Sequence, residues 1–236
     1  MPNGSVTNRR TVFSEDRLNF WPYPSLAADQ TSQLNRLNKL NKWSRSISAR
    51  KPNTIPVRVF SGGQTGVDRA ALDAALEHGL EIGGWCPRGR RAEDGAVPDH
   101  YPLQETAARS YAVRTEWNVR DTDGTLILVL NEISSGTRLT ADAAKSHGKP
   151  LKIEHLSASD GPGLLTAENS PEEQAESVVE WLVRHKIRTL NVAGPRGSSS
   201  KEIYPRAREF MMLVLETLQR QISAASEPVP SSRRRK

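Results

Sequence analysis

The chain is poor in cysteine and has only Cys86 among its 236 residues. A single cysteine excludes an intramolecular disulfide and any metal site built from a cysteine cluster. The sequence also lacks an apolar run approaching the roughly 18 residues of a membrane-spanning helix, and it lacks the apolar segment of a secretory signal. We therefore expect a cytoplasmic protein without membrane association.

Apolar residues are scarce as well, at 36% of the chain, so part of it is expected to lie outside a packed core. Residues 1–52 hold 9 Lys or Arg against 3 Asp or Glu, and residues 223–236 hold 4 against 1. This leaves 20 basic against 23 acidic residues in 53–222. The net charge of +6 therefore belongs to two basic flanks, which we predict to be disordered. Nucleic acid would be bound only through them.

Between the flanks, short apolar runs alternate with segments of helical spacing. We predict strands over 56–60, 81–85, 125–130, 151–153 and 189–192, and helices over 67–78, 103–120, 139–147, 170–186 and 203–222. The unbroken apolar run within 125–130 is typical of a strand buried on both faces. The sequence thus predicts one α/β ligand-binding domain over 53–222: a Rossmann-like, doubly wound, mainly parallel sheet with helices on both faces.

The glycine-rich segment Ser61–Gly66 joins the first predicted strand to the first helix. Backbone N–H groups at a helix N-terminus attract anions, and glycines let the chain approach a ligand closely. The segment lacks the Lys-Ser/Thr pair of a P-loop and does not fit G-x-G-x-x-G. We interpret it as a phosphate-binding turn; a tight turn that serves chain geometry alone is the alternative.

Three further loops follow strands and carry Gly with hydroxyl or Arg side chains: Cys86–Gly95, Asn131–Thr137 and Ala193–Ser200. Ligands of doubly wound sheets bind beyond the carboxyl ends of the strands. We therefore predict a single anion-binding crevice and no metal site. Its predicted residues are Gly62, Gly63, Gln64, Thr65, Gly66, Arg69, Arg90, Arg91, Ser135, Gly136, Thr137, Gly194, Pro195 and Arg196.

Two side chains in the first helix have alternative assignments. Arg69 faces a phosphate or forms an ion pair with Asp73, four residues later. Asp68 is expected to cap the helix through its N–H groups.

Five motifs occur in one order along 53–222: Gly62–Asp73, Gly84–Gly95, Tyr101–Leu103, Arg114–Asp121 and Asn191–Arg196. Together they resemble the putative molybdenum carrier family. The resemblance implies a Rossmann-like fold of the superfamily that includes cytokinin-activating phosphoribohydrolases and the DNA-processing protein. It also implies binding of molybdenum cofactor (molybdopterin), a phosphate-bearing pterin with a molybdate oxyanion. Molybdoenzymes are the implied partners, and analogy with related folds implies a homo-oligomer. Cys86 is expected to be a buried structural thiol, and a thiolate ligand to molybdenum is the alternative.

An enzymatic function is the other hypothesis, namely a nucleotide N-glycosidase, similar to phosphoribohydrolases, that acts on a nucleoside monophosphate or related nucleotide. Those enzymes carry P-G-G-x-G-T-x-x-E at the second glycine turn, where this chain has Ser135-Gly136-Thr137 and then Thr140 in place of Glu. A hydroxyl cannot replace a carboxylate base. The sequence therefore favours a binding protein over a hydrolase, although a carboxylate from another loop remains open: Asp68, Glu93, Asp94, Glu116 or Asp121.

Overall fold

The computed structural model describes residues 57–130, 133–156 and 170–226. Contacts divide the chain into Met1–Lys51 and Pro52–Lys236, and the described residues belong to the second unit. The basic extension predicted at 1–52 lies outside the described residues, as do residues 227–236 of the predicted tail. The first residues of that tail, 223–226, instead continue the last helix, which ends at Ser226.

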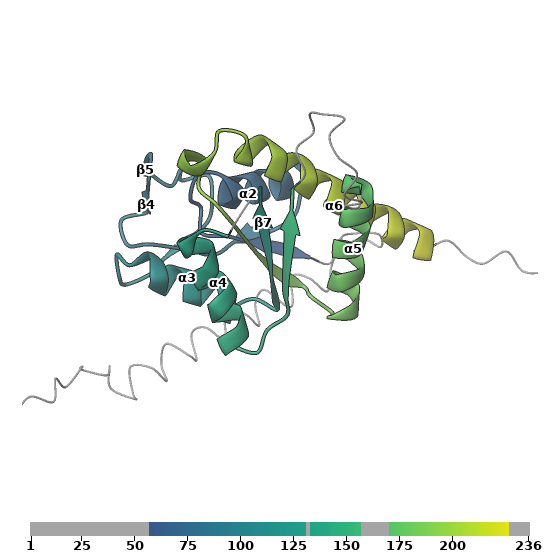
Figure 1. Ribbon diagram of the computed structural model, residues 1–236, viewed down its shortest axis with the longest axis horizontal. Coiled ribbons are helices and arrows are strands. Elements are labelled where there is room, and N and C mark those ends of the chain that lie inside the picture. The colour runs from purple at the N-terminus through teal and green to yellow at the C-terminus, as the bar shows by residue number, and fades with distance from the viewer. Residues whose placement is uncertain (1–56, 131–132, 157–169, 227–236) are drawn as a thin grey trace, which may run out of the picture. The chain divides into compact units, whose positions relative to one another are not determined.

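Strands and helices alternate along the described chain (Figure 1). The strands are β1 (Arg58–Phe60), β2 (Ile82–Gly83), β3 (Trp85–Cys86), β4 (Arg91–Ala92), β5 (Gly95–Ala96), β6 (Gln104–Glu105), β7 (Gly124–Val129), β8 (Leu151–His155) and β9 (Thr189–Ala193). The helices are α2 (Val67–Glu77), α3 (Tyr111–Arg120), α4 (Ser135–Ser146), α5 (Pro171–Arg184), the 3₁₀ turn η1 (Gly197–Ser199) and α6 (Ile203–Ser226).

Five strands form one parallel sheet in the order β2-β1-β9-β7-β8. The last strand along the chain, β9, lies between β1 and β7, with Val59 beside Leu190 and Leu126 beside Val192. The predicted Rossmann-like α/β fold is confirmed. This order places the loops that follow β1 and β9 next to each other at the carboxyl edge of the sheet, where ligands of such sheets bind.

Strand β7 is buried on both faces, as its apolar run predicts. Leu126 and Leu128 belong to the larger core, which α2, α5 and α6 share. Ile127 and Val129 belong to a smaller core with Ala141 of α4. Side chains alternate between the two faces of a strand, so one sequence run supplies both cores.

The helices form two layers. Helix α6 packs against α2 and α5 on one side of the sheet, and α3 packs against α4 on the other (Figure 1). Helix α5 begins at a local cap: Ser170 and Glu173 form a capping box, with Pro171 at the first helical position. No helix in the described part of the chain meets the length and apolarity needed to cross a membrane.

Three predicted boundaries are wrong. The strand expected over 81–85 is interrupted at Gly84, which separates β2 from β3. The helix expected over 103–120 begins only at Tyr111, because residues 104–105 pair with β3: the Gln104 N–H donates to the Gly84 carbonyl at 2.9 Å. The helix expected from 139 begins one turn earlier, at the start of α4. In each case tertiary pairing or a cap outweighs the local apolar pattern.

Candidate functional site

The loop after β1 and the loop after β9 are locked together. The Val67 N–H at the start of α2 donates to the Pro195 carbonyl at 3.2 Å. Gly66, with φ of +80°, has no room for a side chain, because a Cβ there would lie 2.5 Å from the same carbonyl oxygen. Gly194 packs equally closely against the backbone of β7. The predicted residues Gly62–Gly66 and Gly194–Arg196 therefore form one continuous wall at the sheet edge.

Arg114 of α3 covers the first loop. A Cβ added to Gly62 would lie 1.5 Å from its Nη1 atom, so the guanidinium occupies the space that the glycine leaves open. Nη1 also forms a 2.9 Å ion pair with Asp68, and the two side chains are only 12% and 5% exposed. The buried Nε–H of Arg114 has no acceptor among the described residues. One donor at the loop is therefore unused.

Asp68 does not cap α2, so that prediction is wrong. The N-cap position is Gly66, without a side-chain cap. The Asp68 carboxylate instead accepts from the backbone N–H of Gln64 at 3.2 Å and from Arg114. The side-chain oxygen Oε1 of Gln64 accepts from the Glu93 backbone N–H at 2.8 Å, while its Nε2 is buried with no partner in the described part of the chain. A second donor beside the turn is thus available.

A narrow crevice lies between α3, α4 and the carboxyl ends of β1 and β9. It is lined by Gly62, Arg114, Thr115, Asn118, Thr140, Asn191, Val192 and Ala193. Among these described residues there is no Asp, Glu or His. The crevice therefore offers a cation and hydrogen-bonding groups, and its lining offers no carboxylate for acid–base chemistry.

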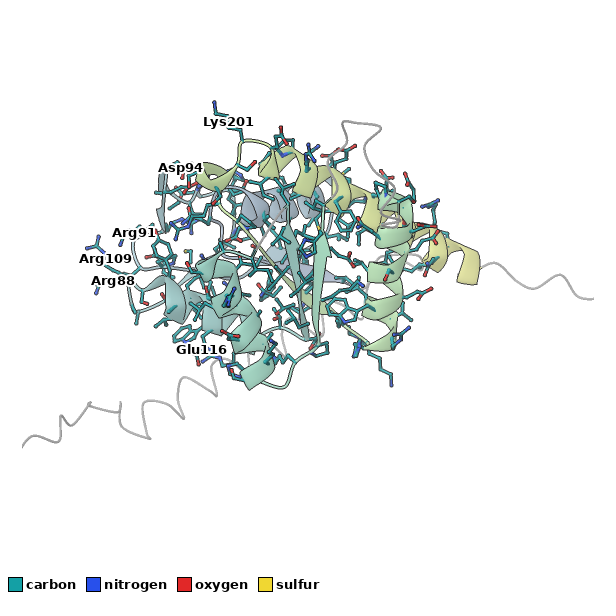
Figure 2. The ribbon with its side chains drawn as sticks, in the orientation of Figure 1. Arg88, Arg91, Asp94, Arg109, Glu116 and Lys201 are labelled. Atoms are coloured by element: carbon teal, nitrogen blue, oxygen red, sulfur yellow. The ribbon has the colours of Figure 1, made fainter. Side chains whose placement is uncertain are left out.

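Three arginines converge on Tyr111, at the start of α3. The guanidinium carbons of Arg196, Arg91 and Arg114 lie 4.8, 5.4 and 5.9 Å from the centre of the Tyr111 ring. Arg91 and Arg196 are exposed, and within residues 57–130, 133–156 and 170–226 neither forms an ion pair. Figure 2 shows Arg91 projecting at the end of the domain where Arg88 and Arg109 also project. We define the Tyr111 cluster as Tyr111, Arg91, Arg114 and Arg196. It concentrates positive charge and attracts an anion.

The adjacent predicted residue, Arg90, is held inside its own loop. Its guanidinium donates to four backbone carbonyls, at 2.8–3.2 Å, those of Val97, Pro98, Tyr101 and Leu103. Its backbone has a φ of +49°. Arg90 therefore organises the loop that carries Arg91, and of the two arginines Arg91 is the one that reaches the Tyr111 cluster.

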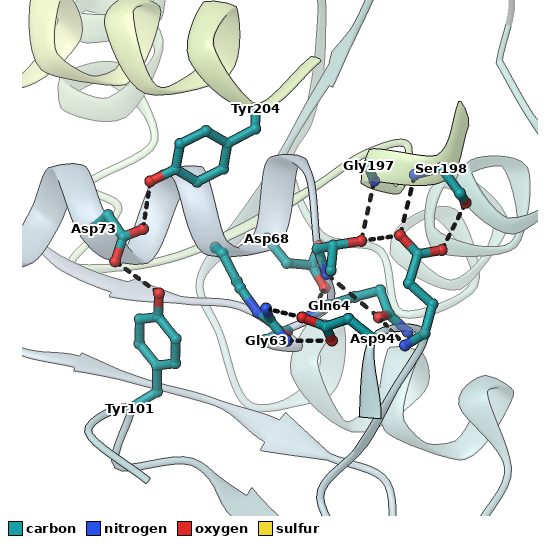
Figure 3. Close-up of polar contacts among 12 residues, drawn as sticks. Gly63, Gln64, Asp68, Asp73, Asp94, Tyr101, Gly197, Ser198 and Tyr204 are labelled. Atoms are coloured by element: carbon teal, nitrogen blue, oxygen red, sulfur yellow. Dashed lines mark hydrogen bonds and ion pairs between the residues drawn. The ribbon is translucent and has the colours of Figure 1, made fainter. Parts of the chain in front are cut away.

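Arg69 is also engaged within the protein. Its guanidinium forms two hydrogen bonds with Asp94, at 2.6 and 2.8 Å, and its Nε donates to the Gly63 carbonyl at 3.1 Å (Figure 3). The alternative partner, Asp73, accepts instead from the hydroxyls of Tyr101 and Tyr204, both at 2.7 Å. The acid that pairs with Arg69 is therefore Asp94 and not the predicted Asp73, because the β4–β5 turn folds over α2.

The third predicted turn joins the site only indirectly. Ser135, Gly136 and Thr137 form the first turn of α4, and the cap is Ser134, whose hydroxyl accepts from the Thr137 N–H at 3.3 Å. Nothing lies within 4 Å of a Cβ placed on Gly136. From this helix, Thr140 is the residue that lines the crevice. The threonine that replaces the hydrolase glutamate therefore faces the candidate site.

Cys86 is fully buried, which supports the structural interpretation of this thiol. Burial is the largest influence on it and raises the pKa of the thiol, which disfavours a thiolate. In the described part of the chain, no group of three or more His, Cys, Asp or Glu is arranged to hold a metal ion.

Arg114 and Tyr111 are absent from the site predicted from the sequence. Tyr111, Arg114 and Asn118 have the i, i+3, i+7 spacing of one helix face. That signal becomes readable only once α3 is known to start at Tyr111, and it would then have identified the face that meets the crevice.

Comparison with known proteins agrees with this fold and its motifs. The profile of the circularly permutated YpsA SLOG family (cpYpsA) matches residues 59–215. The chain is similar to the crystal structure of a protein named putative molybdenum carrier protein from Syntrophus aciditrophicus SB, with a TM-score of 0.62 and 40% identity over 70% of this chain and 98% of that one. No curated protein matches. The chain therefore belongs to the circularly permutated YpsA SLOG family and, as its motifs predict, to the putative molybdenum carrier family.

Proposed function

We propose that this protein binds a phosphate-bearing heteroaromatic cofactor, and that the ligand is molybdenum cofactor. The Tyr111 cluster carries the proposal. It places three guanidinium groups around one aromatic ring, next to a glycine turn with an unused Arg114 donor. The name of the similar protein from Syntrophus aciditrophicus supports the choice of cofactor.

The residues present fit such a cargo through its oxyanions. Phosphate and molybdate are acceptors for arginine, and Arg114 and Gln64 each have a buried donor without a partner among the described residues. A sulfur ligand from the protein is not part of the fit, because Cys86 is buried. We therefore assign Arg91, Arg114 and Arg196 to the anionic groups and Tyr111 to contact with a planar ring.

Titration of the purified protein with molybdenum cofactor tests this proposal. Arg196→Ala is expected to weaken binding about 10-fold or more, since one charge-assisted hydrogen bond contributes about 1.5–3 kcal/mol. Arg184→Ala is the matched control, because Arg184 lies on α5 and its side chain is 72% exposed; it should bind as the wild type does. Absence of saturable binding, or equal loss in the two variants, would rule out the proposed site.

We propose further that the bound cofactor is passed to molybdoenzymes. Reconstitution of a cofactor-free molybdoenzyme by the loaded protein, compared with free cofactor, tests this step. If the loaded protein transfers nothing, the protein stores its ligand and does not deliver it.

Hydrolysis of a nucleotide is the second candidate, and the crevice lining argues against it. Thr140 lies where related hydrolases need a carboxylate, and nearby Asp68 is buried and engaged by Arg114. We expect no free base to be released from a panel of nucleoside monophosphates. Release of base that Asp68→Asn abolishes would instead establish a hydrolase.

A further inference from the structure

The turn between β4 and β5 carries two acids, Glu93 and Asp94, across the first loop. Asp94 is paired with Arg69. The Glu93 carboxylate accepts from the Thr65 hydroxyl, from the Ser198 backbone N–H at 3.1 Å and from the Ser198 hydroxyl at 2.6 Å (Figure 3). Glu93 thus connects the loop after β1 to the loop after β9, and Asp94 fastens the same turn to α2.

The donors that hold Glu93 are of the type that binds a phosphate oxygen. They are two hydroxyls and one backbone N–H, from the two glycine-rich loops that form the wall of the candidate site. Thr65 is itself positioned by the Gly197 N–H, which donates to its hydroxyl at 3.1 Å. A carboxylate and a phosphate both present anionic oxygens, so the same donors suit either group.

The electrostatics of Glu93 agree with its role as a bound anion. Partial burial alone would raise the pKa of its carboxyl, but the hydrogen bonds from Ser198 and Thr65 and the charge of Arg196 lower it overall. Arg196 also belongs to the Tyr111 cluster. The positive field that favours ionised Glu93 is therefore shared with the proposed ligand site.

We propose that Thr65 and Ser198 form an anion subsite that the protein's own Glu93 occupies, and that a phosphate group of the ligand displaces this carboxylate. The inference rests on the proposed function and adds a second anion position to that site. Glu93 then acts as an internal competitor that weakens binding of anions able to contact only part of the site.

The surroundings of Glu93 allow the exchange with little movement. The residue is exposed, and each strand of its hairpin has only two residues. Arg90 holds the base of the hairpin through four carbonyls, and Asp94 stays paired with Arg69. The Glu93 side chain alone therefore needs to leave, while the wall formed by the two loops keeps its shape.

Glu93→Gln tests the competition, with inorganic phosphate and adenosine monophosphate as probes. If the carboxylate occupies the subsite for about nine-tenths of the time, its removal should tighten phosphate binding about tenfold, because apparent affinity follows the fraction of competent sites. Glu180→Gln is the charge-matched control, since Glu180 is an exposed acid on α5. Glu93→Ala, which leaves no acceptor at this position, should give at least the gain of Glu93→Gln.

A double variant separates the subsite from general charge effects. Glu93→Gln with Ser198→Ala should lose most of the gain, since a ligand phosphate then lacks the hydroxyl that Glu93 used. The proposal is overturned if Glu93→Gln binds phosphate no more tightly than Glu180→Gln, or if the gain persists in the double variant.

The result is separable from that of the cofactor titration. If wild type fails to bind molybdenum cofactor while Glu93→Gln gains phosphate affinity, the subsite stands and the identity of the cargo falls. If the cofactor binds but Glu93→Gln leaves phosphate affinity unchanged, the identity of the cargo stands and the subsite falls.

Discussion

Replacement of Arg114 by Met should destabilise the protein because it leaves Asp68 with an uncompensated buried charge. The Asp68 carboxylate is 5% exposed, and Arg114 forms its only ion pair among the described residues. Methionine keeps much of the length and the apolar contacts of the arginine stem. The change therefore isolates the loss of the guanidinium.

The structure sets the expected magnitude. Removal of one member of a buried ion pair costs about 3–5 kcal/mol. Asp68 keeps one hydrogen bond, from the Gln64 N–H at 3.2 Å, so we expect a loss near the lower end, about 3 kcal/mol. When Asp68→Asn is added, no charge remains unpaired, and the double variant should recover to within about 1 kcal/mol of wild type.

Urea unfolding, followed by far-UV circular dichroism and tryptophan fluorescence, measures these free energies. Arg184→Met is the control, because its pair with Glu180 is exposed and contributes at most about 1 kcal/mol. A loss below about 1 kcal/mol for Arg114→Met, or a double variant as unstable as the sum of the two single variants, would refute the argument that a buried pair holds α3 against the first loop.

Three other predictions concern single positions. Gly66→Ala should lower the free energy of unfolding by at least about 2 kcal/mol, because the new Cβ would meet the Pro195 carbonyl at a positive φ. Gly136→Ala should raise it by up to about 1 kcal/mol, since nothing lies near a Cβ at that position. Thermal melting compares the two variants. The Ser198 amide signal in NMR should titrate with Glu93, whose pKa is lowered in the folded protein. The contact between them is therefore complete above the ordinary Glu pKa of about 4.3 and is lost as pH falls through the lower folded value. A titration midpoint at or above the ordinary Glu value would contradict this. Burial and the hydrogen bond to Asp73 raise the pKa of Tyr204 to about 12. Tyr204→Phe should therefore remove a group that ionises near pH 12 in an ultraviolet titration. If the group that disappears instead ionises near pH 10, the contact with Asp73 is absent.

Much of the fold is readable from the sequence because local chemistry specifies it. The apolar run of β7 requires burial on both faces, and the Ser170–Glu173 capping box fixes the start of α5. The glycine turn between β1 and α2 is local in one respect, since the positive φ of +80° at Gly66 favours glycine. These features depend on residues close together in the chain.

The start of α3 was not predictable in this way. Residues 104–105 pair with β3, and the partner backbone groups at Gly84 and Cys86 lie about 20 residues away in sequence. Local helical spacing carries no information about such a partner.

The candidate site likewise has a part that local sequence predicts and a part that depends on tertiary contacts. The sequence alone predicted the two glycine loops, Arg90, Arg91 and Arg196 as site residues, because motifs and strand ends mark them. Tertiary structure decided which charges are free: it joins Arg69 to Asp94, holds Arg90 within its loop, and brings Arg114 onto Gly62. The physical reason is that a guanidinium takes whichever acceptor the fold places within reach, and the fold sets that distance across segments far apart in the chain.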